Sequence, residues 1–163
     1  MAVESAADFA VVAFQEDGLW QAAPLPPRVA AGGLHGLIVA LRQQPAEGGT
    51  IGLVSVNEDF FVAVRLVGHD VRLLLSDVTA AEESPLAREV LDELDLPMPE
   101  DEDLDQVQPA GDLGLFTDLG MDAMELGALC DDLELYPDEM LASVASRLGF
   151  GEPFQRAVDT ALS

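Results

Sequence analysis

The sequence predicts an α+β fold, with an antiparallel sheet and two helices in the N-terminal part and a small helical bundle in the C-terminal part. Three observations support this prediction. Short runs rich in β-branched and aromatic residues alternate with polar turns over residues 1–80. An acidic stretch with several prolines follows. The remaining residues, 111–163, carry apolar positions only at helical spacing.

The first elements form a predicted hairpin followed by a helix. Residues 9–14 are an apolar run of strand length, residues 16–18 supply a turn, and residues 19–22 return as the second strand. Prolines at 24, 26 and 27 end that strand, because proline cannot donate to a strand ladder. Apolar residues at 34, 37, 38 and 41 then form the stripe of an amphipathic helix that ends before Pro45.

Three further strands and a helix complete the N-terminal part. Residues 51–56, 60–67 and 71–76 are rich in apolar and β-branched residues and are separated by short polar turns, which favours an antiparallel meander. Ser84-Pro85 is a helix start, since serine accepts from free N–H groups and proline fits the first turn. The predicted order is therefore β-β-α-β-β-β-α.

The distribution of charge divides the chain into three segments. Residues 81–110 hold eleven acidic residues and one arginine, and the prolines among them interrupt helix. We therefore predict an α+β domain at residues 1–95, an extended acidic linker at 96–110 and a helical domain at 111–163. In the helical domain we expect a short helix from 111 to 119, a capping box of Asp122 and Glu125, and helices that begin near Pro137 and Pro153.

Net charge excludes several classes of partner. The chain has 31 acidic residues, seven arginines and no lysine, for a formal net charge of -24, yet 49% of its residues are hydrophobic. That hydrophobicity predicts a folded protein. Direct binding to nucleic acid or to an anionic membrane needs clustered basic residues, so neither is expected. A basic protein or a cation is the expected partner. The lack of a signal peptide or membrane span predicts a cytoplasmic protein.

No catalytic, cofactor or metal site is predicted. His35 and His69 have no metal-ligand neighbourhood, and the single Cys130 lies on an apolar stripe beside Asp131, where a high thiol pKa is expected. Adjacent carboxylates such as Glu58-Asp59 make an acid–base pair only if they share a cleft, which spacing does not reveal. The acidic residues from 101 onward imitate a calcium loop but place Gln106 where glycine is required.

Partner contacts are expected on acidic residues and on two aromatic residues. Phe60 and Phe61 are strand neighbours, so they point to opposite faces, and packing in the core on both faces is the favoured interpretation. An aromatic side chain left uncovered would be an anchor for a partner. The candidate partner-binding residues are Glu100, Asp101, Glu102, Asp103, Asp105, Asp112, Asp118, Asp122, Trp20 and Phe60.

Two blocks of the sequence carry a family resemblance. Residues 52–68 with 71–77 form one block, and the Gly-Asp-Leu … Asp-Leu-Gly segment at 111–120 forms the more specific one. Over most of its length the chain resembles the tRNA adenosine deaminase-associated proteins of actinobacteria, the high-GC Gram-positive bacteria. It departs from them at Phe116-Thr117, where the family more often has Leu-Ala, and the absence of lysine fits a GC-rich genome.

The resemblance implies a link to the enzyme that converts adenosine to inosine at the wobble position of tRNA. A zinc deaminase needs an H-x-E and a P-C-x-x-C element, and the chain has neither, so it is not the deaminase itself. We expect a non-catalytic acidic accessory protein that binds a basic partner such as this deaminase. The alternatives are a small-ligand protein or enzyme with its site between sheet and helices, and a nucleic-acid mimic that inhibits.

Overall fold

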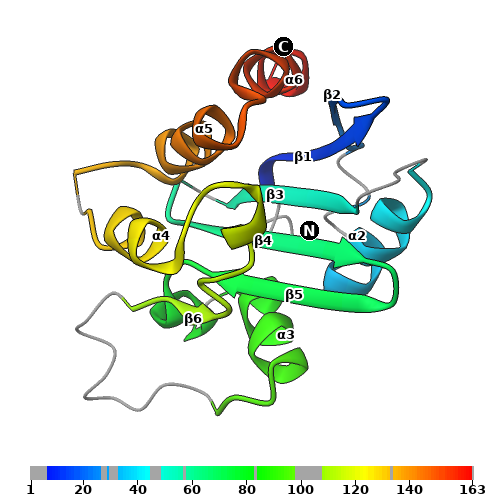
Figure 1. Ribbon diagram of the computed structural model, residues 1–163. Coiled ribbons are helices and arrows are strands. Elements are labelled where there is room, and N and C mark those ends of the chain that lie inside the picture. The colour runs from blue at the N-terminus through cyan, green and yellow to red at the C-terminus, as the bar shows by residue number, and fades with distance from the viewer. Residues whose placement is uncertain are drawn as a thin grey trace.

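A computed structural model describes residues 7–26, 29, 33–44, 49–56, 58–82, 84–97, 108–132 and 134–162. These residues contain one six-stranded antiparallel sheet in the order β2-β1-β3-β4-β5-β6 (Figure 1). The strands are β1 (Ala7–Glu16), β2 (Leu19–Pro24), β3 (Thr50–Val56), β4 (Phe60–Val67), β5 (Asp70–Leu75) and β6 (Ala110–Gly111). The helices are α2 (Gly33–Arg42), α3 (Pro85–Glu93), α4 (Ala123–Cys130), α5 (Pro137–Leu148) and α6 (Gly151–Leu162), with 3-10 helices η1 (Val78–Glu82) and η3 (Thr117–Leu119).

The predicted α+β class and the order β-β-α-β-β-β-α are confirmed. The β1–β2 hairpin closes with a two-residue turn in which Asp17 and Gly18 both have positive φ, 54° and 80°. Positive φ at both positions gives a turn whose twist matches that of the flanking strands. The local sequence signal therefore fixes the register of the hairpin, in which Glu16 lies opposite Leu19.

Helix ends follow the predicted capping residues. Ser84 precedes α3 and accepts a hydrogen bond from the Ala87 N–H at 3.3 Å, while Pro85 begins the helix. Asp122 accepts from the Glu125 N–H at 2.8 Å, which confirms the capping box of α4. Pro137 is the first residue of α5. Each cap satisfies backbone groups that the helix itself leaves without partners.

The segment from 108 to 119 differs from the prediction. Residues 108–110 were assigned to the linker, but Gln108 O accepts from the Val78 N–H at 2.7 Å, and Ala110 and Gly111 pair with β5. The sequence predicts a helix over 111–119, yet only η3 is helical there. Because residues 110 and 111 hydrogen-bond to the sheet, the chain turns away from β6 instead of starting a helix.

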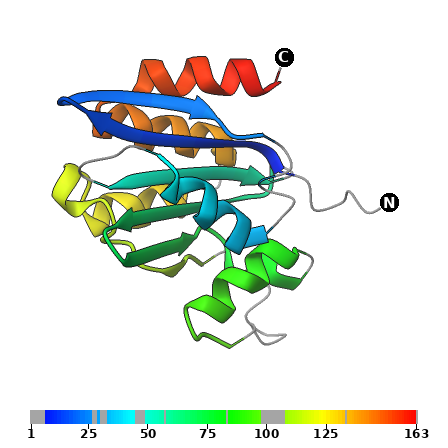
Figure 2. The same cartoon turned by 90° about the vertical axis from the view of Figure 1, so that its right-hand side faces the viewer.

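Two hydrophobic clusters lie on opposite faces of the sheet. One contains side chains of α2 and α3 with Phe60, Val62 and Val64 of β4, and the other contains side chains of α4, α5 and α6 with Phe61 and Ala63. Figures 1 and 2 show the two sets of helices on the two sides of the strands. Residues 111–162 thus share a core with the N-terminal sheet. The helices of the described residues include none that is both long and apolar enough to cross a membrane.

Candidate functional site

The structure places five of the ten candidate partner-binding residues. Glu100, Asp101, Glu102, Asp103 and Asp105 lie outside the described residues. The other three carboxylates, Asp112, Asp118 and Asp122, lie between β6 and the start of α4. Their oxygens accept hydrogen bonds from other groups of the chain.

Two arginines of the sheet bind two of these carboxylates. Arg65 is 4% exposed and donates from both Nη atoms to the Asp118 carboxylate and from Nη1 to Leu115 O. Hydrogen bonding to Arg65 is the main reason that the pKa of Asp118 lies below its ordinary value. Arg72 donates from Nε to Asp112 Oδ2, and Asp112 Oδ1 accepts from the Gly114 N–H at 2.9 Å.

Helix α4 is joined to α5 by a third ion pair. Arg147 of α5 donates from Nε to Glu125 Oε2 at 2.9 Å. That hydrogen bond is the largest cause that lowers the pKa of Glu125 and raises the pKa of Arg147. Together with the Asp122 cap of α4, these contacts show that carboxylates of residues 112–125 hold parts of the chain to one another.

The two candidate aromatic residues belong to the interior. Phe60 is 2% exposed in the cluster that contains α2 and α3, so its ring is not presented at the surface. Trp20 is half-buried, and its ring centroid lies 4.7 Å from that of Phe150, just before α6. Phe61 is also buried, which confirms core packing on both faces of β4.

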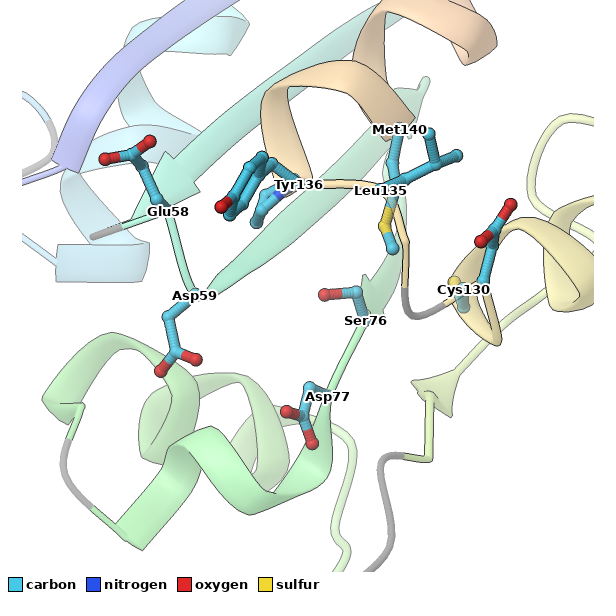
Figure 3. Close-up of a pocket in the computed structure, with 10 residues that line it drawn as sticks. Glu58, Asp59, Ser76, Asp77, Cys130, Leu135, Tyr136 and Met140 are labelled. Atoms are coloured by element: carbon cyan, nitrogen blue, oxygen red, sulfur yellow. The ribbon is translucent and has the colours of Figure 1, made fainter.

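A recess at one end of the sheet gathers other carboxylates. It has a volume of about 240 Å³ and lies between the β3–β4 turn, the end of β5 and the loop from α4 to α5. Figure 3 shows its side chains drawn from these three segments. We call it the acidic cleft. Its lining residues are Glu58, Asp59, Ser76, Asp77, Cys130, Asp132, Leu135, Tyr136, Pro137 and Met140.

Local hydrogen bonds fix the floor of the acidic cleft. Asp77 is 8% exposed, and its Oδ1 accepts from the N–H and the Oγ1 of Thr79 in the first turn of η1. Ser76 Oγ accepts from the Phe61 N–H at 2.9 Å. Asp8 Oδ2 accepts from the Glu58 N–H at 2.7 Å and so fixes the turn that carries Glu58 and Asp59. The floor is therefore held by buried or backbone-bonded groups.

The rim of the acidic cleft is accessible. Glu58, Asp59 and Asp132 are exposed, and Tyr136, which lines the same recess, is 60% exposed. No basic residue is among those that line the cleft. Carboxylates at a concave surface with low-dielectric walls concentrate a negative potential, and an aromatic ring adds attraction for a cation over its face. The arrangement is suited to a positively charged side chain or ligand.

Cys130 lines the cleft as an apolar group. It is 1% exposed, and burial, with a smaller contribution from Asp131, raises the pKa of its thiol to about 12. The thiolate is the nucleophilic and metal-binding form. At neutral pH the Cys130 side chain is therefore protonated, in agreement with the prediction from its acidic neighbours. No group of three or more His, Cys, Asp or Glu side chains among the described residues is arranged to hold a metal ion.

Comparisons with known proteins identify relatives over nearly the whole chain. A model of the Rv3753c-like tRNA adenosine deaminase-associated protein family matches residues 8–151. Protein Rv3753c of Mycobacterium tuberculosis (strain ATCC 25618 / H37Rv) is 39% identical over 153 residues, which cover 93% of this chain and 87% of the relative. The chain belongs to this Rv3753c-like family. The resemblance stated from the sequence is thereby confirmed. No solved structure matches the chain.

The family-like motif at 111–120 has a structural explanation in this Rv3753c-like protein. Gly111 has φ +114°, and a Cβ atom there would lie 2.3 Å from Leu73 O of β5, so only glycine allows this approach. Asp112 and Asp118 bind Arg72 and Arg65, and Gly120, also at φ +114°, ends η3. The motif fixes residues 110–120 to the sheet, and its residues do not line the acidic cleft.

Sequence reasoning missed the acidic cleft for a definite reason. Glu58-Asp59 and Asp131-Asp132 attract notice as adjacent carboxylates, but they lie more than seventy positions apart in the chain. Only the antiparallel order of β3, β4 and β5, with α5 packed against the sheet, brings Glu58, Asp59 and Asp132 to the same recess. Their positions in turns at one end of the sheet were the available signal.

Proposed function

We propose that this protein is a non-catalytic accessory protein that binds tRNA adenosine deaminase through the acidic cleft. The observation that carries the proposal is the cleft itself, which Glu58, Asp59 and Asp132 line together with an exposed Tyr136 in a member of a tRNA adenosine deaminase-associated family. Asp112, Asp118 and Asp122 bind groups of the chain outside the recess, whereas Glu58, Asp59 and Asp132 are exposed side chains that line it, Asp132 also accepting from the Glu134 N–H at 3.1 Å.

A deaminase that acts on tRNA is a suitable basic partner. Proteins that bind nucleic acid carry clustered Arg and Lys side chains for contact with phosphates. The chain has a net charge of -24 and no lysine, so attraction to such a surface is strong and long-ranged at low ionic strength. In the proposed complex, an Arg or Lys side chain of the deaminase enters the cleft and lies against Tyr136.

Several features support a non-catalytic role. The H-x-E and P-C-x-x-C elements of a zinc deaminase are missing from the sequence. The single cysteine is buried with a raised pKa, and the described histidines are exposed and away from the cleft. A role in binding needs only shape and charge, which the cleft supplies.

Binding of the deaminase from the same organism tests the proposal. Titration calorimetry at low salt is expected to show a complex whose affinity falls as salt is added, because surface charge pairs are screened. The triple variant Glu58→Gln, Asp59→Asn and Asp132→Asn removes three exposed charges of the cleft while keeping the size of each side chain. We expect it to weaken binding by about tenfold, since each exposed pair contributes up to roughly 1 kcal/mol.

A matched control separates the cleft from the overall charge. The triple variant Glu16→Gln, Asp17→Asn and Asp70→Asn removes the same charge from exposed positions at the opposite end of the strands. Its affinity should stay close to that of the unmodified chain. Equal losses in the two triple variants would overturn the assignment to the cleft, and no detectable complex at low salt would overturn the proposed function.

The effect on the enzyme distinguishes two ways of acting. One kind of accessory protein covers the basic surface of the deaminase only in the absence of tRNA. It raises the melting temperature of the deaminase and leaves the deamination rate at saturating tRNA unchanged. A nucleic-acid mimic competes with tRNA and raises its apparent KM. Rate measurements over a range of tRNA concentrations separate the two outcomes.

A small cationic ligand is the second candidate for the acidic cleft. The recess lies between the sheet and the C-terminal helices, the place expected for a ligand site, although its 240 Å³ is below the usual size of drug-like pockets. Titration with a polyamine such as spermidine tests this candidate. Saturable binding that disappears in the cleft triple variant and persists in the control triple variant would favour it.

A further inference from the structure

We propose that the edge strand β2 is the interface of a symmetric homodimer, in which β2 of one copy pairs antiparallel with β2 of a second copy. β2 lies at one edge of the sheet, with no described strand beyond it (Figure 1). Because the two-residue turn pairs Glu16 with Leu19, the N–H and C=O groups of Leu19, Gln21 and Ala23 point toward β1.

The alternate residues of β2 point their backbone groups outward. The Leu25 N–H donates to Ala10 O of β1 at 2.8 Å, which fixes the same alternation at the other end of β2. The N–H and C=O groups of Trp20 and Ala22 therefore lie on the open side of the strand. Pro24 follows them and has no N–H to offer. An open edge of this kind is a template for another strand.

The composition of β2 is unusual for an exposed edge of so acidic a protein. Its residues, Leu19 to Pro24, include no ionisable side chain, and Leu19 is 67% exposed. Native proteins commonly protect an edge with charged residues or cover it. The opposite edge shows both devices, because β5 carries Asp70 and Arg72 and is partly covered by β6. Among the described residues β2 has neither device, and Pro24, a third protective device, removes only the last outward N–H of the strand.

Rigid support keeps β2 ready for pairing. Trp20 and Ala22 pack against the cluster that contains α5 and α6, and the Trp20 ring lies against Phe150. The side chains of Leu19, Gln21 and Ala23 face solvent on the other side of the sheet. One face of the strand is thus held against the core, while its other face is exposed.

Self-complementarity identifies a second copy as the occupant. When Gln21 lies opposite Gln21 of the second copy, Trp20 and Ala22 exchange hydrogen bonds with Ala22 and Trp20 of that copy, so every outward N–H of these residues is used. The two-fold axis then passes beside Gln21, at a pair of positions with close side chains. A second copy therefore supplies hydrogen-bond partners for the outward backbone groups of both Trp20 and Ala22.

The neutral composition of β2 itself favours a second copy over a basic strand at this edge. β2 has no carboxylate that would bind a basic strand. Two copies of this neutral strand can pair without placing like charges opposite each other. In this register, Asp17 of each copy lies opposite residue 25 of the other. The two Asp17 residues are then separated by eight strand positions, roughly 26 Å, which is several Debye lengths at physiological ionic strength.

Sedimentation velocity of the full chain without any partner tests the proposal. We expect a dimer of twice the 17.3 kDa chain mass, strengthened by added salt because screening reduces the repulsion between two acidic chains. Gln21→Glu and Gln21→Arg each place like charges at the two-fold axis and should weaken the dimer by about tenfold or more. An equimolar mixture of the two variants should restore a dimer. The neutral variant Gln21→Thr is the matched control and should remain dimeric.

A backbone variant provides an independent measurement. Ala22→Pro removes an outward N–H without removing a hydrogen bond to β1, so it should weaken the dimer while thermal unfolding of the monomer stays cooperative. A monomeric unmodified chain at all salt concentrations would overturn the proposal. So would equal dimerisation of all Gln21 variants. Weaker deaminase binding by Ala22→Pro in a chain that is always monomeric would instead assign the edge to the deaminase.

Discussion

At the scale of single residues, the ion pair of Arg65 and Asp118 shows how a buried charge is used in this fold. Arg65 is 4% exposed in the second half of β4, and the carboxylate of Asp118 and the carbonyl of Leu115 accept from its guanidinium. An unpaired charge at such a site is costly, so the pairing is needed for the fold to tolerate Arg65. The pair joins the 110–120 segment to the sheet.

Asp118→Asn should lower the free energy of unfolding by about 1–2 kcal/mol at neutral pH. This loss is smaller than that for breaking a fully buried ion pair, because the Asp118 side chain is 62% exposed. The pKa of Asp118 in the folded chain lies below its ordinary value of 3.8. Its contribution is therefore fully present above that ordinary value and is lost as the pH falls through the lowered pKa.

Urea unfolding of both chains over a range of pH checks this expectation. The difference in unfolding free energy between the unmodified chain and Asp118→Asn should be constant near neutral pH and should shrink in acid. Asp92→Asn, at an exposed position of α3, is the control and should differ little from the unmodified chain. A difference that grows as the pH falls would contradict the argument.

At the scale of elements, the helix caps could be predicted from the sequence, whereas the conformation of residues 110–120 could not. Ser84, Asp122 and Pro137 begin helices because their effects act within one turn of chain. The segment after the acidic stretch is instead decided by contacts with β5, which lies some forty positions earlier in the chain. Local spacing predicted a helix there because it contains no information about Arg65, Arg72 or the open edge of β5.

Comparing two glycines of this segment distinguishes the cost of a positive φ from the cost of a steric clash. Gly111 and Gly120 have the same φ of +114°, but only at Gly111 would a Cβ atom meet neighbouring backbone, 2.3 Å from Leu73 O. Gly120→Ala should cost about 1 kcal/mol from the positive φ alone. Gly111→Ala should cost roughly 1–3 kcal/mol more, since β6 must move away from β5. Chemical unfolding of the two variants gives both values, and equal costs would refute the role of close approach.

At the scale of the whole molecule, charge and composition predicted the class of surface but not its place. The net charge of -24 indicates an acidic surface in any fold, whereas the acidic cleft exists only where strand order and the packing of α5 bring turns together. The two proposed associations, binding of the deaminase and formation of the homodimer, should respond to salt in opposite directions. Added salt should weaken binding of the deaminase and strengthen the dimer. Measuring both at the same series of salt concentrations therefore tests each one independently.

Adjacent Phe60 and Phe61 enter different hydrophobic clusters, so β4 is a structural element of both layers at once. Neither layer can separate from the sheet without exposing a face of the same strand, which couples their unfolding. The amide protons of β3 and β4 should consequently exchange with solvent only through global unfolding, and far more slowly than those of β2 or α4. Hydrogen exchange followed by mass spectrometry should show the central strands as the last to take up deuterium, in one cooperative step.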